Sequence, residues 1–251
     1  MNKPDLSIII PLKNEAERLP ETMREILSFM GTKCLYEILL IENGSTDNTY
    51  EVAMEFAEVL SFVRVLQSDP GKGAAVKLGM TQAGGLYRYM CDVDLSTPIE
   101  SLPAFMEAAK THDIVIGSRE KDGAERIGEP EERHSMGRVF NALVQIMHLI
   151  GIEDSQCGFK LFRWDVANDL FQHQTLDGFA FDVEILHLAR RRGYSIHELP
   201  VTWTYDPDSR VDPRRDSWQM FWDLWKIRLN EARGVYGDLS RSNIVEMRVK
   251  P

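Results

Sequence analysis

The sequence predicts an α/β fold built around a mainly parallel sheet. Through the first half of the chain, short apolar runs rich in β-branched residues alternate with longer stretches of helical periodicity. Strands that alternate with helices form right-handed βαβ units, and such units make a parallel sheet covered by helices. Ligands of these sheets bind beyond the carboxyl ends of the strands. We therefore expect the functional residues at those ends.

The individual elements follow from this alternation. Strands are expected at residues 6–10, 38–41, 62–66, 87–91 and 114–116, and helices at 18–30, 50–60, 72–82 and 99–110. The last helix follows Thr97-Pro98-Ile99-Glu100, which predicts Thr97 as the capping residue and Pro98 as the first helical residue. Residues 121–133 are charged and contain glycine, which predicts a mobile loop, with a plain solvated connection as the alternative.

Charge and cysteine content exclude several classes of protein. The 29 Lys and Arg residues against 39 Asp and Glu residues give a net charge of −10, whereas nucleic acids are bound by clustered basic side chains. Cys34, Cys91 and Cys157 form no CxxC pair, which predicts reduced cytoplasmic thiols without a zinc site or a disulfide framework. We expect no signal peptide and no transmembrane span, because no apolar run reaches the required ~18 residues. A soluble or peripheral protein is predicted.

Two helices expected in the second half have unusually wide apolar arcs. In residues 136–149 the polar side chains form one narrow stripe, and in residues 216–233 the apolar arc includes Trp218, Trp222 and Trp225, three of the five tryptophans. Such arcs are wider than that of an ordinary surface helix. Two interpretations stay open: burial against the sheet or in a dimer interface, or a helix lying in a membrane surface, where Trp is favoured.

The strongest local motif is Asp92-Val93-Asp94, which follows the expected strand at 87–91. Carboxylates two residues apart on a strand point the same way, so both can reach one hard cation. Mg²⁺ or Mn²⁺ is held by one or two carboxylates together with substrate phosphates. Most such triplets are solvated loop charges, but the place of this one between an apolar strand and a helix favours a metal site.

Polar segments also follow the first three expected strands. The first strand ends in Pro11-Leu12-Lys13-Asn14-Glu15 and the second in Glu42-Asn43-Gly44-Ser45, where a base and a ribose could be bound. The alternative for the second segment is a turn followed by helix capping. Gly71-Lys72-Gly73 follows the third strand and suits an anionic phosphate group at a helix start, although it matches neither GxxxxGK[ST] nor GxGxxG.

Taken in order, these segments resemble the family 2 glycosyltransferases of GT-A fold. Four later segments narrow the resemblance to the dolichyl- and polyprenyl-phosphate glycosyltransferases, and to their glucosyl branch more than to the mannosyl branch: Val115-Ile116-Gly117-Ser118-Arg119, Asp154-Ser155-Gln156-Cys157-Gly158-Phe159-Lys160-Leu161-Phe162, Gly178-Phe179-Ala180-Phe181-Asp182-Val183-Glu184-Ile185-Leu186 and Glu198-Leu199-Pro200-Val201-Thr202-Trp203. The resemblance implies a GT-A fold, a nucleotide-sugar donor, Mg²⁺ or Mn²⁺, inversion at the anomeric carbon and a lipid phosphate acceptor.

The same resemblance implies roles for the matching residues. The nucleotide-sugar would be bound by Pro11, Leu12, Asn14, Glu15, Glu42, Asn43, Lys72, Asp92 and Val93. Asp92 and Asp94 would hold the metal, and the catalytic residues would be Asp94, Arg119 and Arg133. The acceptor phosphate would lie at Arg119, Arg133, Ser209 and Arg210.

Three positions depart from the family pattern. Glu42-Asn43 stands in place of the usual Asp-Asp pair, which weakens the inference of the base. Ser96 stands where the mannosyl branch often has a metal-binding Gln, and Gly137 replaces a frequent Ser four residues after Arg133. We expect one GT-A domain at 1–236, with a nucleotide-sugar half at 1–120 and an acceptor half at 121–236, followed by a tail at 237–251.

A phosphate acceptor changes the chemistry that the site must supply. A sugar hydroxyl needs a general base, whereas a phosphate monoester with a second pKa of about 6 is already mostly a dianion at neutral pH. Arginine forks position and neutralise such a nucleophile. We therefore assign no catalytic base, and we interpret Asp182 and Glu184 as capping and dipole-complementing acids at a helix start.

The predicted function is transfer of a sugar, with glucose as the first expectation, from a UDP-sugar to a polyprenyl phosphate by a peripheral enzyme at the cytoplasmic face of a membrane. The alternatives are a GDP-mannose-dependent mannosyltransferase, a family 2 enzyme with a soluble acceptor, and a non-catalytic nucleotide-sugar-binding module. A Rossmann-type oxidoreductase is disfavoured because its glycine fingerprint is missing. The sequence predicts no oligomeric state.

Overall fold

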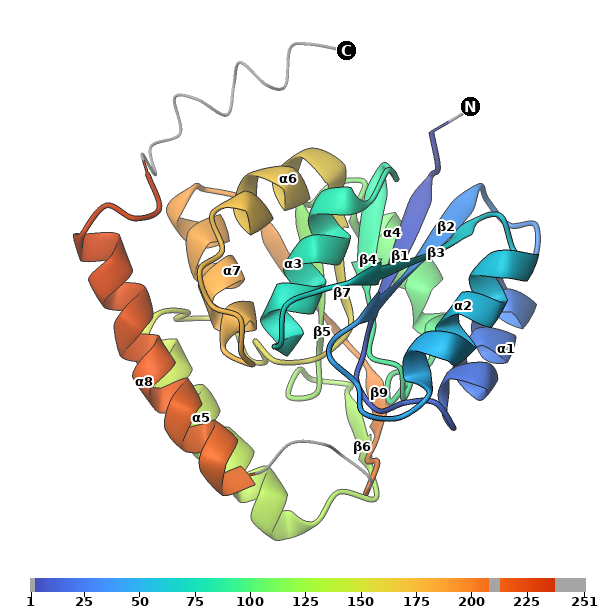
Figure 1. Cartoon of the computed structure of the whole chain (residues 1–251). Coiled ribbons are helices and arrows are strands. Elements are labelled where there is room, and N and C mark those ends of the chain that lie inside the picture. Colours follow the sequence, from blue (N-terminus) through green and yellow to red (C-terminus); the bar gives the residue numbers. More distant parts are fainter. Residues whose placement is uncertain (1–2, 208–212, 238–251) are drawn as a thin grey trace.

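A mixed seven-stranded sheet forms the centre of the computed structural model, which describes residues 3–207 and 213–237 (Figure 1). The strand order is β3-β2-β1-β4-β7-β5-β8. Strand β7 runs antiparallel to both of its neighbours, and the other pairs are parallel. The strands are β1 (Leu6–Leu12), β2 (Tyr36–Glu42), β3 (Val63–Gln67), β4 (Tyr87–Met90), β5 (Ile114–Ser118), β7 (Lys160–Arg163) and β8 (Ile196–Pro200).

Helices cover both faces of this sheet because successive strand residues point to opposite sides. Ile8 and Ile10 pack with helices α1 (Leu19–Met30), α2 (Thr49–Val59) and α4 (Leu102–Ala108). Ile9 packs in a second apolar cluster on the opposite face, formed with α3 (Lys72–Gln82), α6 (Trp164–Gln172) and α7 (Phe181–Arg191). The same cluster includes Val144 of α5 (Glu131–Met147) and Leu224 of α8 (Pro213–Ala232).

The expected strands and helices of the first half are present, with small differences at their ends. The expected capping of the helix after residue 97 is wrong. Pro98 is extended, at φ −59° and ψ 139°, so the 3-10 helix η1 (Ile99–Ser101) begins after it without a side-chain cap. Residues 121–133 are not only a loop, because β6 (Glu125–Ile127) lies within them and pairs with β9 (Thr202–Thr204).

Strand β7 brings the second half of the sequence into the middle of the sheet. It lies between β4 and β5, and its register pairs Met90 with Lys160. If this antiparallel register continues for two residues beyond Met90 on one strand and before Lys160 on the other, Asp92 lies across from Gly158. The segment that precedes β7 is therefore placed against the carboxyl end of β4.

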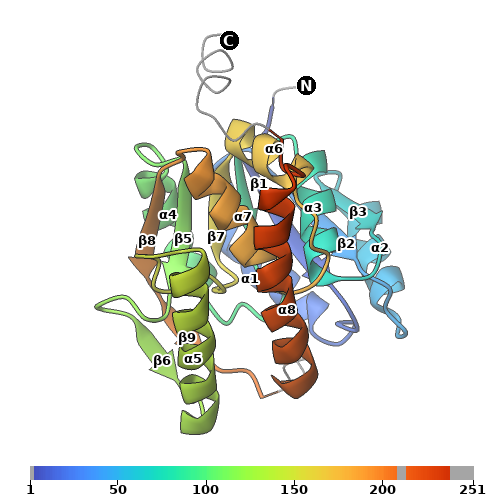
Figure 2. The same ribbon diagram turned by 90° about the vertical axis from the view of Figure 1, so that its left-hand side faces the viewer.

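Helices α5 and α8 lie side by side at the edge of the molecule (Figures 1 and 2). The backbone carbonyl of Leu224 accepts a hydrogen bond from Nε2 of His148 at 3.0 Å, and α8 buries Met220, Leu224 and Ile227. On the opposite side α8 exposes Trp218, Trp222, Trp225 and Leu229, with exposed fractions of 65%, 55%, 54% and 47%. These four residues, here called the tryptophan face, are not buried within the chain. No helix in the described residues is long and apolar enough to cross a membrane.

Candidate active site

The carboxyl ends of β1, β2 and β4 open onto a pocket of about 610 Å³. Eight of the residues predicted for the donor and the metal line it: Pro11, Leu12, Glu15, Asn43, Lys72, Asp92, Val93 and Asp94. Its far wall comes from the second half of the chain, through Asp177, Gly178, Phe179, Gln219, Met220 and Asp223. Residues from six separate segments thus meet at one edge of the sheet.

Asn14 and Glu42 do not line this pocket but shape the loop beside it. Glu42 is buried, and its Oε1 accepts a hydrogen bond from the Ser45 N–H at 2.5 Å. Asn14 has a left-handed backbone, at φ 56°, and its Oδ1 accepts from the Thr46 N–H at 2.7 Å. Both side chains therefore hold the loop after β2 against the end of β1, as the turn interpretation of this segment expects.

Asn43 connects the end of β2 to the loop before α3. Its Nδ2 donates to the carbonyls of Asp69 and Gly71 at 2.8 and 2.9 Å, and its Oδ1 accepts from the Gly71 N–H at 3.0 Å. The side chain is buried. A carboxylate has no N–H to donate, so it could not make the first two bonds. The bonds of this side chain therefore favour an amide at a position where the resemblance implies an aspartate.

The Gly71-Lys72-Gly73 segment packs closely against the backbone of residues 176–177, and it also places the Lys72 side chain. A Cβ at Gly71 would lie 2.9 Å from the Asp177 carbonyl carbon, and one at Gly73 would lie 2.6 Å from the Leu176 carbonyl oxygen. The Gly73 N–H donates to the Asp177 carbonyl at 2.8 Å. The expected phosphate-binding helix start is therefore partly occupied by the protein's own backbone, and the Lys72 side chain supplies the positive charge.

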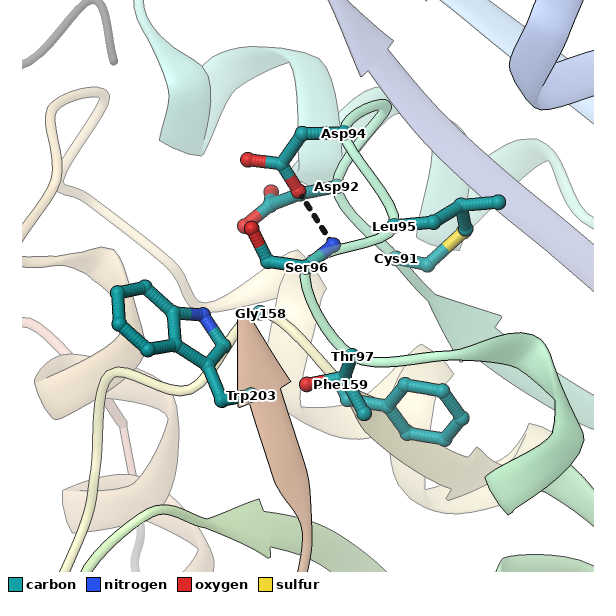
Figure 3. A pocket seen from close by; sticks show the side chains of 9 residues that line it. All are labelled: Cys91, Asp92, Asp94, Leu95, Ser96, Thr97, Gly158, Phe159 and Trp203. Atoms are coloured by element: carbon teal, nitrogen blue, oxygen red, sulfur yellow. Dashed lines mark hydrogen bonds between the residues drawn. The ribbon is translucent and has the colours of Figure 1, made fainter. Parts of the chain in front are cut away.

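Lys72 reaches the Asp92-Val93-Asp94 motif. Its Nζ lies 2.6 Å from Asp92 Oδ1, and Asp94 Oδ1 accepts a hydrogen bond from the Ser96 N–H at 2.9 Å (Figure 3). Burial alone would raise the pKa of Asp92, but the positive charge of Lys72 outweighs it and keeps that pKa below its usual value. Burial and the nearby charge of Asp92 raise the pKa of Asp94. The charge of Asp92 is thus balanced by Lys72, whereas Asp94 forms no ion pair with the described residues.

Gly158 provides the space that Asp92 occupies. A Cβ at residue 158 would lie 2.7 Å from Asp92 Cγ and closer still to Oδ2, well inside van der Waals contact. Two residues further on, the fully buried Lys160 contacts Asp182 Oδ1 at 2.7 Å and donates to the Cys157 carbonyl at 2.5 Å. The segment before β7 therefore shapes the wall behind the two aspartates.

The two aspartates fit a hard divalent cation. Their carboxylate oxygens belong to the donor class that Mg²⁺ and Mn²⁺ prefer, and both residues line the pocket. No group of three His, Cys, Asp or Glu side chains within the described residues is arranged to hold a metal. A cation at this position would therefore share its coordination with substrate phosphate oxygens and water, as Mg²⁺ commonly does.

Arg119 is held next to this site by a carboxylate. Its Nε and Nη2 donate to the two oxygens of Asp154 at 2.6 and 2.9 Å. Burial alone would raise the pKa of Asp154, but the Arg119 guanidinium keeps that pKa well below its usual value. The guanidinium also lies 5.3 Å from the ring of Trp203, which lines a small cavity with Asp92 and Asp94 (Figure 3). The Arg133 side chain, Ser209 and Arg210 lie outside what the structure describes.

The acids at the start of α7 do not cap that helix, which corrects the capping part of our interpretation, whereas their place in its first turn agrees with the dipole part. The helix has no side-chain cap, although both acids lie in its first turn. Asp182 pairs with Lys160, and Glu184 Oε2 accepts from the Thr175 and Leu176 N–H groups at 3.0 and 2.9 Å. These partners are distant in sequence or depend on a loop, so periodicity alone could not reveal them.

Comparison with known proteins identifies the family of this chain. The sequence profile of Glycosyl transferase family 2 matches residues 7–171. The chain belongs to this family. It is 34% identical over 248 residues to dolichyl-phosphate β-glucosyltransferase of Dictyostelium discoideum, covering 92% of this chain and 76% of the relative. The human enzyme of that name is 31% identical over 249 residues, covering 92% and 77%, and that of Saccharomyces cerevisiae is 30% identical over 257 residues, covering 93% and 77%.

Solved structures identify the fold of this family 2 glycosyltransferase. Glucosyl-3-phosphoglycerate synthase from Mycobacterium tuberculosis in complex with UDP has a TM-score of 0.67 at 17% identity, covering 89% of this chain and 80% of that one. The same synthase with Mn²⁺, UDP and glucosyl-3-phosphoglycerate has a TM-score of 0.64 at 15% identity, covering 89% and 80%. The expected GT-A fold is thus confirmed, and the family match and the relatives above confirm the expected glycosyltransferase activity.

We expect Gly158→Ala to weaken binding of UDP in the presence of Mn²⁺ by about tenfold or more, the cost of losing one well-placed polar contact. The added methyl group must displace the Asp92 carboxylate. Calorimetric titration measures the effect. Gly84→Ala is the matched control, because its Cβ would meet neighbours only at ordinary contact distances of 3.4 Å or more. Unchanged UDP binding by Gly158→Ala would show that Asp92 does not need this space.

We expect Asn43→Asp to lower the free energy of unfolding by about 2 kcal/mol, because two partly buried carbonyls lose their donor. Urea unfolding measures this change. Asn48→Asp makes the same chemical change at an exposed helix N-cap position and should alter stability by less than about 0.5 kcal/mol. Equal stability of the two variants would contradict the bridging role of the Asn43 amide.

Proposed function

We propose that this enzyme transfers glucose from UDP-glucose to the phosphate of a polyprenyl or dolichyl lipid. The observation that carries the proposal is the identity of 30–34% to three dolichyl-phosphate β-glucosyltransferases over 92–93% of the chain. The pocket supports it, because two carboxylates and a lysine lie together where a nucleotide diphosphate and a cation would bind. The distant synthase crystallised with Mn²⁺ and UDP supports the choice of donor and metal.

The reaction exchanges one bond at the anomeric carbon of glucose. An oxygen of the lipid phosphate forms the new bond from the face opposite UDP, the bond to the UDP oxygen breaks, and UDP leaves with the electron pair. The phosphate dianion is itself the nucleophile, so no residue has to remove a proton. The acids of α7 fit this absence of a base, since both are engaged in contacts within the protein.

The protein's contribution is charge placement. Asp94, with Asp92 beside it, would hold Mg²⁺ or Mn²⁺ against the donor diphosphate, and the bound cation supplies Lewis-acid stabilisation of the departing charge. Lys72 lies at the same aspartates and would add a second positive charge. Asp154 engages Nε and Nη2 of Arg119, so the fork is fixed in orientation while Nη1 makes no hydrogen bond to the described residues. That group would contact the acceptor phosphate.

A lipid acceptor requires the active site to reach a membrane surface, and the tryptophan face of α8 would bind that surface. Its rings suit the boundary between headgroups and acyl chains, where Trp is favoured. The neighbouring α5 exposes Ile146, and Ile150 follows it, at 75% and 73%. With a net charge of −10, apolar contact rather than attraction to anionic lipid would have to supply the binding. The three free cysteines suit the reducing cytoplasmic side.

The proposed reaction predicts product formation from UDP-glucose, polyprenyl phosphate and Mg²⁺ or Mn²⁺. Excess EDTA should abolish it, and Asp94→Asn should lower turnover by about 100-fold or more through the lost ligand oxygen. Extraction of labelled glucose into organic solvent measures the product. Asp122→Asn makes the same change on an exposed loop and should retain activity. Preference for GDP-mannose, or full activity of Asp94→Asn in EDTA, would contradict the proposal.

We expect Trp222→Ser combined with Trp225→Ser to release the enzyme from neutral phosphatidylcholine vesicles containing polyprenyl phosphate. Both side chains are more than half exposed, so the fold should survive their loss. Vesicle co-sedimentation measures binding, and transfer to a short, water-soluble prenyl phosphate should be retained. Trp164→Ser, which removes a tryptophan 38% exposed at the start of α6, should leave vesicle binding intact. Undiminished binding of the double variant would exclude this face as the membrane contact.

A further inference from the structure

One wall of the donor pocket carries polar side chains that the reaction described above does not use. Gln219, Met220 and Asp223 of α8 lie beside the segment 177–179 in this wall. The polar ends point the same way, since a Cβ at Gly178 would lie 3.6 Å from Gln219 Nε2 and 3.9 Å from Asp223 Oδ2. Residues 219 and 223 are one helical turn apart, so they present one continuous polar edge to the pocket.

These two side chains have unused hydrogen-bonding capacity. Neither Gln219 nor Asp223 forms a hydrogen bond or an ion pair with the part of the chain that the structure describes, although Asp223 is half-buried. Three other acids around the site are paired with cations: Asp92 with Lys72, Asp154 with Arg119, and Asp182 with Lys160. Water can solvate both groups while the pocket is empty, and a ligand that displaces this water must supply hydrogen bonds in return.

The side chains of this wall, Gln219 and Asp223, suit one part of a nucleotide-sugar better than the others. A carboxylate repels the diphosphate, which the cationic side of the pocket at Lys72 suits instead. A hexose is neutral and dense in hydroxyl groups, which donate to a carboxylate and exchange hydrogen bonds with an amide. Met220 and Phe179 on the same wall offer apolar surface to the C–H groups of a sugar ring.

We propose that Asp223 and Gln219 bind hydroxyl groups of the transferred sugar and so determine which sugar the enzyme accepts. This inference rests on the proposed use of a UDP-sugar and adds the residues that recognise its sugar. A site whose polar groups hydrogen-bond a substrate hydroxyl discriminates strongly against a substrate that lacks it. The sugar would then lie in the pocket against the wall that α8 forms with the 177–179 segment, on the far side from Pro11 and Leu12.

The test separates binding of the sugar from binding of the nucleotide. The wild type, Asp223→Asn and Gln219→Ala are titrated calorimetrically with UDP and with UDP-glucose, both with Mn²⁺ and without any acceptor. Each variant should bind UDP within about twofold of the wild type but UDP-glucose about fivefold or more weakly, the loss of one hydrogen bond. Arg233→Gln, an exposed charge just beyond the end of α8, is the control and should bind both ligands normally.

Two results would overturn the inference: equal weakening of UDP and UDP-glucose, or no weakening of either. A series of UDP-glucose analogues that each lack one hydroxyl supplies a second readout. Asp223→Asn should show no further loss with the analogue that lacks the hydroxyl bound by residue 223. Selective loss of UDP-glucose binding in an enzyme that transfers to no polyprenyl phosphate would support this inference while contradicting the proposed acceptor.

Discussion

The active site depends on the absence of a side chain at Gly158, which leaves room for Asp92. The Asp92 carboxylate occupies the space that a side chain at residue 158 would fill. The antiparallel register of β4 and β7 sets these positions across from each other, and α3 brings Lys72 to the same carboxylate from the side. Three segments that are far apart in the sequence thus fix one functional group, so its position is set by the core rather than by a flexible loop.

Around Asp92 the protein places three acidic side chains in close ion pairs with basic ones. Lys72 faces Asp92, Lys160 faces Asp182, and Arg119 faces Asp154, while Asp94 has no cationic partner among the ion pairs of the described residues. Fixed charges in a partly buried site act strongly on the charge that develops during a reaction, and they need little reorganisation. The unpaired carboxylate at Asp94 is therefore the natural position for a cation that arrives with the donor.

The sequence predicts the local features of this arrangement and misses those that depend on distant contacts. Strand positions, the aspartate pair and the glycine-flanked lysine follow from apolar periodicity and spacing within a few residues. The insertion of β7 between β4 and β5 does not, because antiparallel pairing across some 70 residues leaves no periodic signal. The bridging amide of Asn43 and the pairing of Lys160 with Asp182 likewise become visible only when their partners are placed.

Helix α8 gives the site its second wall, with tryptophans on its outer face and Asp223 on the pocket side. The most direct test of the whole account is a crystal structure of the enzyme with UDP-glucose and Mn²⁺. We predict the cation at Asp94, the diphosphate beside Lys72, and the glucose ring against Gln219 and Asp223. A cation bound away from both aspartates, or a glucose ring lying against Pro11 and Leu12, would contradict the account.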